Sequence, residues 1–171
     1  MFNILFICMG NICRSPAAEG FFARHLQDSR FQDLISIDSA ATHSYHIGNA
    51  PDPRAIQVGA QYDVDISQLR ARKVRSTDFN DFDLIIAMDH HNIADLQAIQ
   101  PGGSTADIKL MMAYHPENSP HKQSDEVPDP YYGDIDGFVT MYELLELATA
   151  GLLKNVEEQL NPNISPRQTT K

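Results

Sequence analysis

A cysteine and an arginine six positions apart are the residues of this sequence best suited to do chemistry together. They are Cys8 and Arg14 in the segment CMGNICRS (residues 8–15), with Gly10 between them, where a missing side chain lets the backbone bend tightly. An ionised thiol is a nucleophile, and a guanidinium presents parallel N–H groups that match two phosphate oxygens. The pair therefore indicates a thiolate that attacks an arginine-bound phosphoryl group.

The sequence on either side of this segment predicts a strand before it and a helix after it. NILFIC (residues 3–8) is an apolar run typical of a buried strand, and SPAAEGFFARHL (residues 15–26) repeats apolar residues at helical spacing. Ser15 suits an N-cap and Pro16 the first helical position. A loop that enters a helix points its N–H groups at one place, and the helix dipole favours an anion there. We expect a phosphate-binding loop that keeps Cys8 ionised.

A second polar segment, VPDPYYG (residues 127–133), offers the proton donor that such a reaction needs. Expulsion of an alkoxide or a phenolate from phosphorus is assisted by a general acid on the far side of the phosphate, and Asp129 is the candidate. Two prolines beside Asp129 stiffen the segment. Tyr131 and Tyr132 follow it and are suited to form the walls of a pocket for an aromatic leaving group.

The remaining pattern predicts the scaffold. Apolar runs that alternate with helical segments indicate an α/β fold, a single doubly wound domain over residues 1–160 with a polar tail over 161–171. Its four-stranded parallel sheet has the order 2-1-3-4 and helices on both faces, and the phosphate loop lies at a strand C-terminal end. Strands are expected at 3–8, 35–40, 81–88 and 107–112. Helices are expected at 15–26, 53–61 and 90–100 and from about 137 onward, and Asp89 is the expected N-cap of the helix over 90–100.

Composition restricts the class of protein. With 171 residues, 42% of them hydrophobic, and a net charge of −10, the chain is expected to be soluble and not to bind nucleic acid or anionic membranes. No signal peptide is evident, and both cysteines lie in one loop, so we expect a cytoplasmic protein without disulfides. No spacing typical of a metal site occurs, and we expect no metal or cofactor. Asp78, Asp81 and Asp83 are expected on a solvated face.

Four motifs together closely resemble the low-molecular-weight protein tyrosine phosphatases, and the resemblance extends over nearly the whole chain. They are CMGNICRSPAAE (8–19), SYHIGNAPDPRA (44–55), AMDHHN (87–92) and VPDPYYG (127–133). The resemblance implies that Cys8 attacks phosphorus in line while Arg14 and the loop amides hold the oxygens, and that Asp129 protonates the leaving phenolate. A phosphocysteine forms, and water then hydrolyses it with Asp129 as base. The implied partners are a phosphotyrosine protein as substrate and phosphate as product, for a monomer or weak dimer.

The resemblance also implies which residues contact the substrate. Asn11 and Ser15 shape the loop and hydrogen-bond the thiolate; a histidine that supports this loop in many members is replaced here by Leu69. Tyr45 and Tyr131 are expected to wall a pocket too deep for phosphoserine, although Tyr45 could instead pack partly in the core. The full predicted set is Met9, Gly10, Asn11, Ile12, Cys13, Ser15, Tyr45, Tyr131 and Tyr132.

Three alternatives share parts of this pattern. Members that act on phosphoarginine tend to carry threonine where this chain has Ile12, so isoleucine favours phosphotyrosine. An arsenate reductase of the same fold needs cysteines after Cys13, and none follows. A phosphocarrier that forms phosphocysteine has no need of Arg14 and Asp129 together. Cys13 further resembles the neighbouring cysteine that, in the family, traps the nucleophile as a reversible disulfide.

Overall fold

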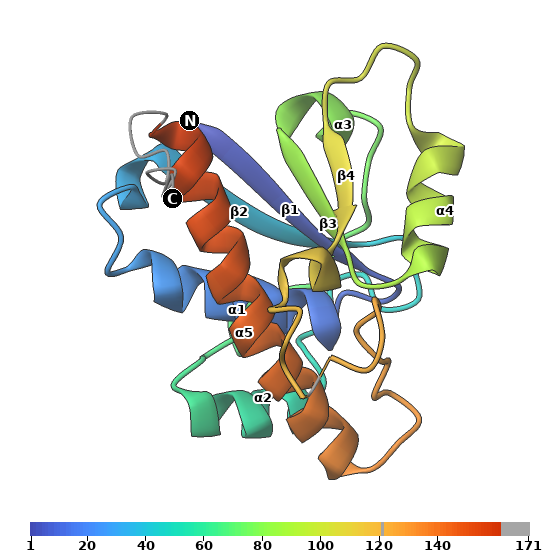
Figure 1. The fold of residues 1–171 in the computed structure, drawn as a ribbon. Coiled ribbons are helices and arrows are strands. Elements are labelled where there is room, and N and C mark those ends of the chain that lie inside the picture. The colour runs from blue at the N-terminus through green and yellow to red at the C-terminus, as the bar shows by residue number, and fades with distance from the viewer. Residues whose placement is uncertain (121, 162–171) are drawn as a thin grey trace, which may run out of the picture.

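The computed structural model describes residues 1–120 and 122–161 and contains one parallel sheet of four strands (Figure 1). Their order in the sheet is β2-β1-β3-β4, as the sequence predicts. The strands are β1 (Phe2–Cys8), β2 (Ile35–Ala41), β3 (Leu84–Ala87) and β4 (Asp107–Leu110). The α/β fold, the strand order and the parallel pairing are therefore confirmed.

The centre of the sheet is β1, and this places the loop that follows it. β1 pairs with β2 from Phe2 opposite Ile35 to Cys8 opposite Ala41, and with β3 on its other edge. The chain leaves β1 toward β2, whereas β3 is added on the opposite side. Such a switch in direction opens a crevice at the carboxyl ends of the central strands, where α/β proteins bind their ligands. Cys8, the last residue of β1, lies at this crevice.

Helices cover both faces of the sheet (Figure 1). One core joins β1 residues such as Phe6 to the apolar sides of α1 (Arg14–Leu26), α2 (Pro53–Gly59) and α5 (Ile135–Leu160). The other joins alternate residues of the same strand to α3 (Asp78–Asp81) and α4 (His90–Ile99). Because successive side chains of a strand point to opposite faces, one apolar strand serves both cores.

Several expected boundaries are wrong. The α-helix expected over 53–61 ends at Gly59, and a single 3-10 turn (Ala60–Tyr62) follows it. The strand expected over 107–112 ends at Leu110, because Met111 and Met112 enter another 3-10 turn (Met111–Tyr114) and pack in the core that α5 shares. The strand expected over 81–88 is limited to β3, and α5 begins at Ile135 rather than near 137. A third 3-10 turn, Gln32–Leu34, precedes β2.

The acidic cluster near β3 is only partly a solvated face. Asp78 is 2% exposed and accepts hydrogen bonds from the guanidinium of Arg72 at 2.9 Å and from the backbone N–H of Arg75 at 2.8 Å. It therefore fixes the segment that precedes the short helix α3, which the sequence pattern did not predict. Asp83 accepts the backbone N–H of Asn3 at the start of β1.

The predicted tail over 161–171 lies outside the described residues, except for Asn161, which ends α5. Within the part of the chain that the structure describes, no helix combines the length and the apolar composition needed to cross a membrane.

Candidate active site

The thiol of Cys8 sits at the floor of a tight loop between β1 and α1. Its Sγ accepts a hydrogen bond from the backbone N–H of Asn11 at 3.2 Å and lies 3.1 Å from the hydroxyl of Ser15. The loop turns at Asn11, whose φ of 55° is left-handed. The backbone N–H and the Ser15 hydroxyl can both donate a hydrogen bond to a sulfur at this position. The loop thus has the geometry of an anion site with a nucleophile beneath it.

The side chain of Asn11 is held on three sides in this unusual conformation. Its Oδ1 accepts the backbone N–H of Arg72 at 3.0 Å, and its Nδ2 donates to the hydroxyls of Ser15 and Ser39, both at 2.9 Å. The hydroxyl of Ser39 donates in turn to the carboxylate of Glu19. Burial raises the pKa of Glu19, although its bond to Ser39 opposes the shift. A chain of hydrogen bonds therefore connects a buried carboxyl group to the loop.

Leu69 stands where the resemblance implies a supporting histidine, and the structure shows which groups hold the loop in this chain. Leu69 packs against the hydrophobic core. The contacts to Asn11 come from the main chain of Arg72, three residues further on, and from Ser39 on β2. Backbone and hydroxyl groups therefore hold the Asn11 side chain, and Leu69 takes no part in these hydrogen bonds.

The expected positions of Ser15 and Pro16 at the start of the helix are wrong. Cys13 occupies the N-cap position of α1 and has no capping side-chain bond, so Ser15 is a helical residue whose hydroxyl faces Cys8 and Asn11 instead. Pro16 is consequently the third residue of the helix, still within the first turn where its missing N–H has no partner to lose. Gly10 lies in this tight loop, and the positive φ of the loop falls on Asn11. A Cβ there would lie 3.0 Å from the imidazole of His46, so Gly10 makes room for that ring.

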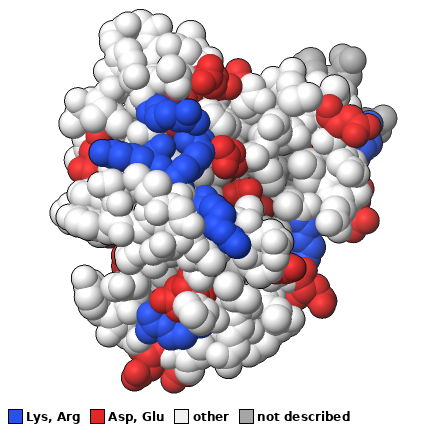
Figure 2. Space-filling model, turned by 180° about the vertical axis from the view of Figure 1, so that it is seen from behind, with Lys and Arg blue, Asp and Glu red and all other residues white. Residues whose placement is uncertain are grey.

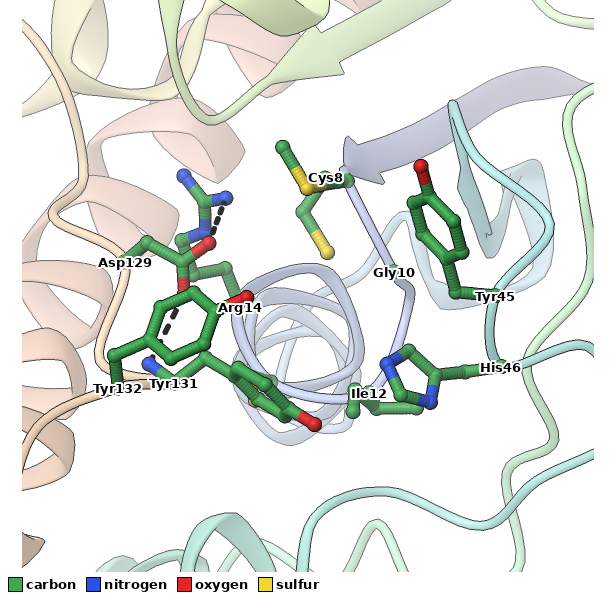
Figure 3. Close-up of a pocket in the computed structure, with 11 residues that line it drawn as sticks. Cys8, Gly10, Ile12, Arg14, Tyr45, His46, Asp129, Tyr131 and Tyr132 are labelled. Atoms are coloured by element: carbon green, nitrogen blue, oxygen red, sulfur yellow. Dashed lines mark hydrogen bonds and ion pairs between the residues drawn. The ribbon is translucent and has the colours of Figure 1, made fainter.

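Arg14 is buried, 2% exposed, and it is bound on both sides of its guanidinium. Nη1 donates to Asp89 at 2.6 Å and to the carbonyl of Val127 at 3.2 Å, while Nη2 donates to Asp129 at 2.7 Å (Figure 3). Burial by itself lowers the pKa of Arg14, but the charges of Cys8, Asp129 and Asp89 outweigh it and raise that pKa. Arg14 is therefore a permanent cation in the site.

Asp89 belongs to the site, although the sequence pattern predicts only its role as a helix cap. The cap is present, since Oδ1 accepts the backbone N–H of Asn92 at 2.7 Å. Its other oxygen, Oδ2, holds Arg14. The signal that could have indicated this second contact is its place just after β3, at the same edge of the sheet as Cys8.

Asp129 projects from a loop that other residues hold in place. Its Oδ1 accepts the backbone N–H of Tyr131 at 3.1 Å, and Oδ2 binds Arg14. Arg54 donates to the carbonyls of Tyr131 and Gly133 at 3.0 and 2.9 Å, which ties the loop to the start of α2. The Asp129 carboxylate is thereby fixed across the cavity from the loop that contains Cys8.

These elements enclose a cavity of about 360 Å³ (Figure 3). Tyr131 and His46 are neighbours in its wall, with tilted rings whose centroids are 5.8 Å apart, and Tyr132 stands edge-on to Tyr131. Tyr45 is 74% exposed and stacks on His43, so it is not a core residue. The lining comprises Cys8, Met9, Gly10, Ile12, Cys13, Arg14, Tyr45, His46, Asp129, Tyr131 and Tyr132.

The structure brings most of the predicted residues together, with two exceptions and one addition. Asn11 and Ser15 do not line the cavity; they lie beneath it and hold the sulfur. His46 lines it and was not predicted, because nothing in its local sequence indicates a contact with Gly10. Burial and the nearby charge of Cys8 raise the pKa of Cys13, which keeps that second thiol neutral. Among the described residues, no group of three or more His, Cys, Asp or Glu side chains is placed to hold a metal ion.

Comparison with known proteins identifies the family. Residues 3–162 match the model of the family described as low molecular weight phosphotyrosine protein phosphatase. A protein of that name from Schizosaccharomyces pombe is 40% identical over 155 residues, which cover 90% of this chain and 96% of the relative.

Solved structures agree with this result. The crystal structure of a protein tyrosine phosphatase from Entamoeba histolytica superposes with a TM-score of 0.86 at 36% identity, covering 94% of this chain and 99% of the other. A Drosophila arginine phosphatase superposes with a TM-score of 0.80 at 29% identity, covering 90% and 97%. The chain belongs to the low molecular weight phosphotyrosine protein phosphatase family.

Proposed function

We propose that this protein hydrolyses phosphotyrosine in proteins through a phosphocysteine intermediate. The observation that carries the proposal is the convergence of three groups on one cavity: the sulfur of Cys8, the guanidinium of Arg14 and the carboxyl group of Asp129. A thiolate at a helix N-terminus, a fixed cation and an opposed acid are the three components that this displacement at phosphorus requires.

In the first step the Cys8 thiolate forms an S–P bond as the bond from phosphorus to the tyrosine oxygen breaks. Asp129, protonated in the substrate complex, gives its proton to that oxygen, so that neutral tyrosine leaves and a carboxylate remains. The loop N–H groups and the guanidinium of Arg14 bind the non-reacting oxygens and stabilise their charge in the transition state.

The contacts of Arg14 support a change of partner when substrate binds. Nη1 is held by Asp89 and Val127, so this side of the guanidinium stays in place. Within residues 1–120 and 122–161, Nη2 binds Asp129 alone. A phosphate on the loop competes with that carboxylate for Nη2, which frees Asp129 to turn toward the leaving oxygen. Asp89 is therefore a positioning residue.

In the second step water attacks phosphorus and the S–P bond breaks. The Asp129 carboxylate takes a proton from this water, phosphate leaves, and the Cys8 thiolate is regenerated. No other reactant is needed. Continued turnover distinguishes this hydrolase from a carrier, which passes its phosphoryl group to another molecule.

The walls of the cavity support an aromatic substrate. Tyr131 is half-buried, and Tyr45 stands on the opposite rim beside His46. A phenyl ring between these two tyrosines places the phosphate on the floor of the loop. The side chain of phosphoserine is shorter, so its phosphate does not reach the floor when the peptide backbone rests against the rim. Ile12, an apolar residue of the loop, adds no hydrogen-bonding group for a guanidino phosphate.

Peptides that differ only in the phosphorylated residue test the proposed substrate. We expect kcat/KM for a phosphotyrosine peptide to exceed that for the matched phosphoserine peptide by at least about 10³-fold, since the reacting atoms must come within near-attack distance. A phosphoarginine peptide is the second comparison, because a structural relative is an arginine phosphatase. Faster hydrolysis of the phosphoserine or the phosphoarginine peptide would refute the assignment.

Removal of the Ser39 hydroxyl tests how the loop is supported. In Ser39→Ala the amide of Asn11 and the carboxyl group of Glu19 each lose a buried partner, a cost of roughly 1–3 kcal/mol. We expect kcat/KM for para-nitrophenyl phosphate to fall about tenfold and the affinity for vanadate to fall with it. The matched control is Ser36→Ala on the same strand; wild-type kinetics in Ser39→Ala would contradict this role.

A further inference from the structure

A band of positive charge lies beside the cavity of this acidic protein. The segment RARKVR (residues 70–75) contains four of the 13 Lys and Arg residues of a chain whose net charge is −10. In Figure 2 several Lys and Arg side chains gather in the upper left of the face shown, while others lie apart from them, lower down and at the right. We name the residues Arg70, Lys73 and Arg75 the basic strip.

The basic strip differs from its neighbour Arg72 in having no counter-charge. Arg72 binds the carboxylates of Asp38 and Asp78, at 2.8 and 2.9 Å. The three residues of the basic strip are exposed and form no ion pair with any carboxylate in the part of the chain that the structure describes. Their charge is thus available to a partner.

The backbone directs two of these side chains to solvent together. Lys73 forms a strand-like bridge with Ala41, and Val74, between Lys73 and Arg75, is buried at 4% exposure. Because alternate residues of an extended segment point to the same side, Val74 fixes Lys73 and Arg75 on the outer face. Burial of Val74 therefore sets the orientation of the strip.

The basic strip lies close to the nucleophile. Ala41 pairs with Cys8 on one side, and on the other it forms a parallel bridge with Lys73. Neighbouring strands are about 4.8 Å apart, so the backbone of Lys73 lies about 10 Å from that of Cys8.

The segment also borders the rim of the cavity. Gly48 donates its backbone N–H to the carbonyl of Ala71 at 2.7 Å, and Ala71 donates to Asn49 at 2.9 Å. Gly48 and Asn49 continue directly from Tyr45 and His46, which line the cavity. A peptide that leaves the cavity over this rim therefore passes onto the basic strip.

We propose that the basic strip binds acidic residues of the substrate and so selects phosphotyrosine segments that carry Asp or Glu about three to six positions from the phosphotyrosine. This inference rests on the proposed function. The span follows from the rise of about 3.3 Å per residue in an extended peptide, for which 10 Å is about three residues. Charge complementarity mainly raises the rate of encounter.

Three peptides of equal length test the proposal: one neutral, one with acidic residues before the phosphotyrosine and one with them after it. We expect one acidic peptide to exceed the neutral one about tenfold in kcat/KM at low salt, and this preference to decline in about 0.5 M salt. The variant R70Q/K73Q/R75Q should lose the preference and keep wild-type turnover of para-nitrophenyl phosphate.

The matched control is R30Q/K109Q/K154Q, which removes three positive charges elsewhere on the molecule. It should keep the preference. If both variants lost the preference for the acidic peptide equally, the preference would depend on the total charge of the protein and the proposal would be overturned. A wild type without any preference for an acidic peptide would overturn it as well. The proposal would also be overturned if the wild type, but not R70Q/K73Q/R75Q, bound phosphatidylserine vesicles and showed no peptide preference. The basic strip would then be a membrane-binding surface. Failure to hydrolyse even the neutral peptide would refute the proposed function instead.

Discussion

Cys8→Ser is expected to abolish turnover, with kcat for para-nitrophenyl phosphate reduced by at least about 10⁴-fold. The reason is the nucleophile itself: a serine hydroxyl is far less acidic than a thiol, and the described residues that contact Sγ, Asn11 and Ser15, supply no base to activate it. Steady-state kinetics measures the loss, and acid quenching followed by mass spectrometry should detect a phosphoryl group on Cys8 of the wild type only.

The second cysteine provides the matched control for this experiment. Cys13 also lines the cavity, but burial raises the pKa of its thiol, so Cys13→Ser should retain most of the activity. Cys8→Ser should still bind vanadate, because the loop amides and Arg14 remain. An active Cys8→Ser protein alongside an inactive Cys13→Ser protein would reverse the assignment of the nucleophile.

The fold was predictable because its signals are local. An apolar strand, a loop and an amphipathic helix follow one another in residues 3–26, and three further apolar runs indicate a parallel sheet. The failures lie where tertiary packing overrides the local pattern. Met111 and Met112 are as apolar as a strand requires, yet they fill the core beside α5. The four-residue helix α3 carries no periodicity, and it exists because buried Asp78 binds Arg72 and Arg75.

The site was predictable wherever one short motif holds the chemistry, as for Cys8 and Arg14. Contacts between distant segments were not. Asp89 reaches Arg14 across 75 positions, and Arg72 supports Asn11 across 61. No spacing rule gives such pairs, since they depend on which strands become neighbours. One of the contacts that hold Asn11 comes from a backbone N–H, a group that is present at almost every residue and leaves no signature in the sequence.

Asp129→Asn is expected to lower kcat/KM for phenyl phosphate by about 10²–10⁴-fold, as for a lost general acid. The asparagine side chain keeps the shape of Asp129 but has no acidic proton to give to the leaving oxygen. Since kcat/KM reports the first step, the loss should be smaller for para-nitrophenyl phosphate, whose leaving group is stable without protonation. A plot of the loss against leaving-group basicity should therefore slope upward.

Two measurements separate the loss of this acid from a loss of binding. In the free protein Asp129 competes with phosphate for Nη2 of Arg14, so Asp129→Asn should bind vanadate at least as tightly as the wild type. The phosphocysteine should also accumulate, because the same residue is the base of the second step. Asp134→Asn, an exposed carboxylate five positions on, is the control for charge and should behave as the wild type. If Asp129→Asn weakened vanadate binding and slowed all aryl phosphates equally, Asp129 would be a positioning residue for Arg14 and not the proton donor.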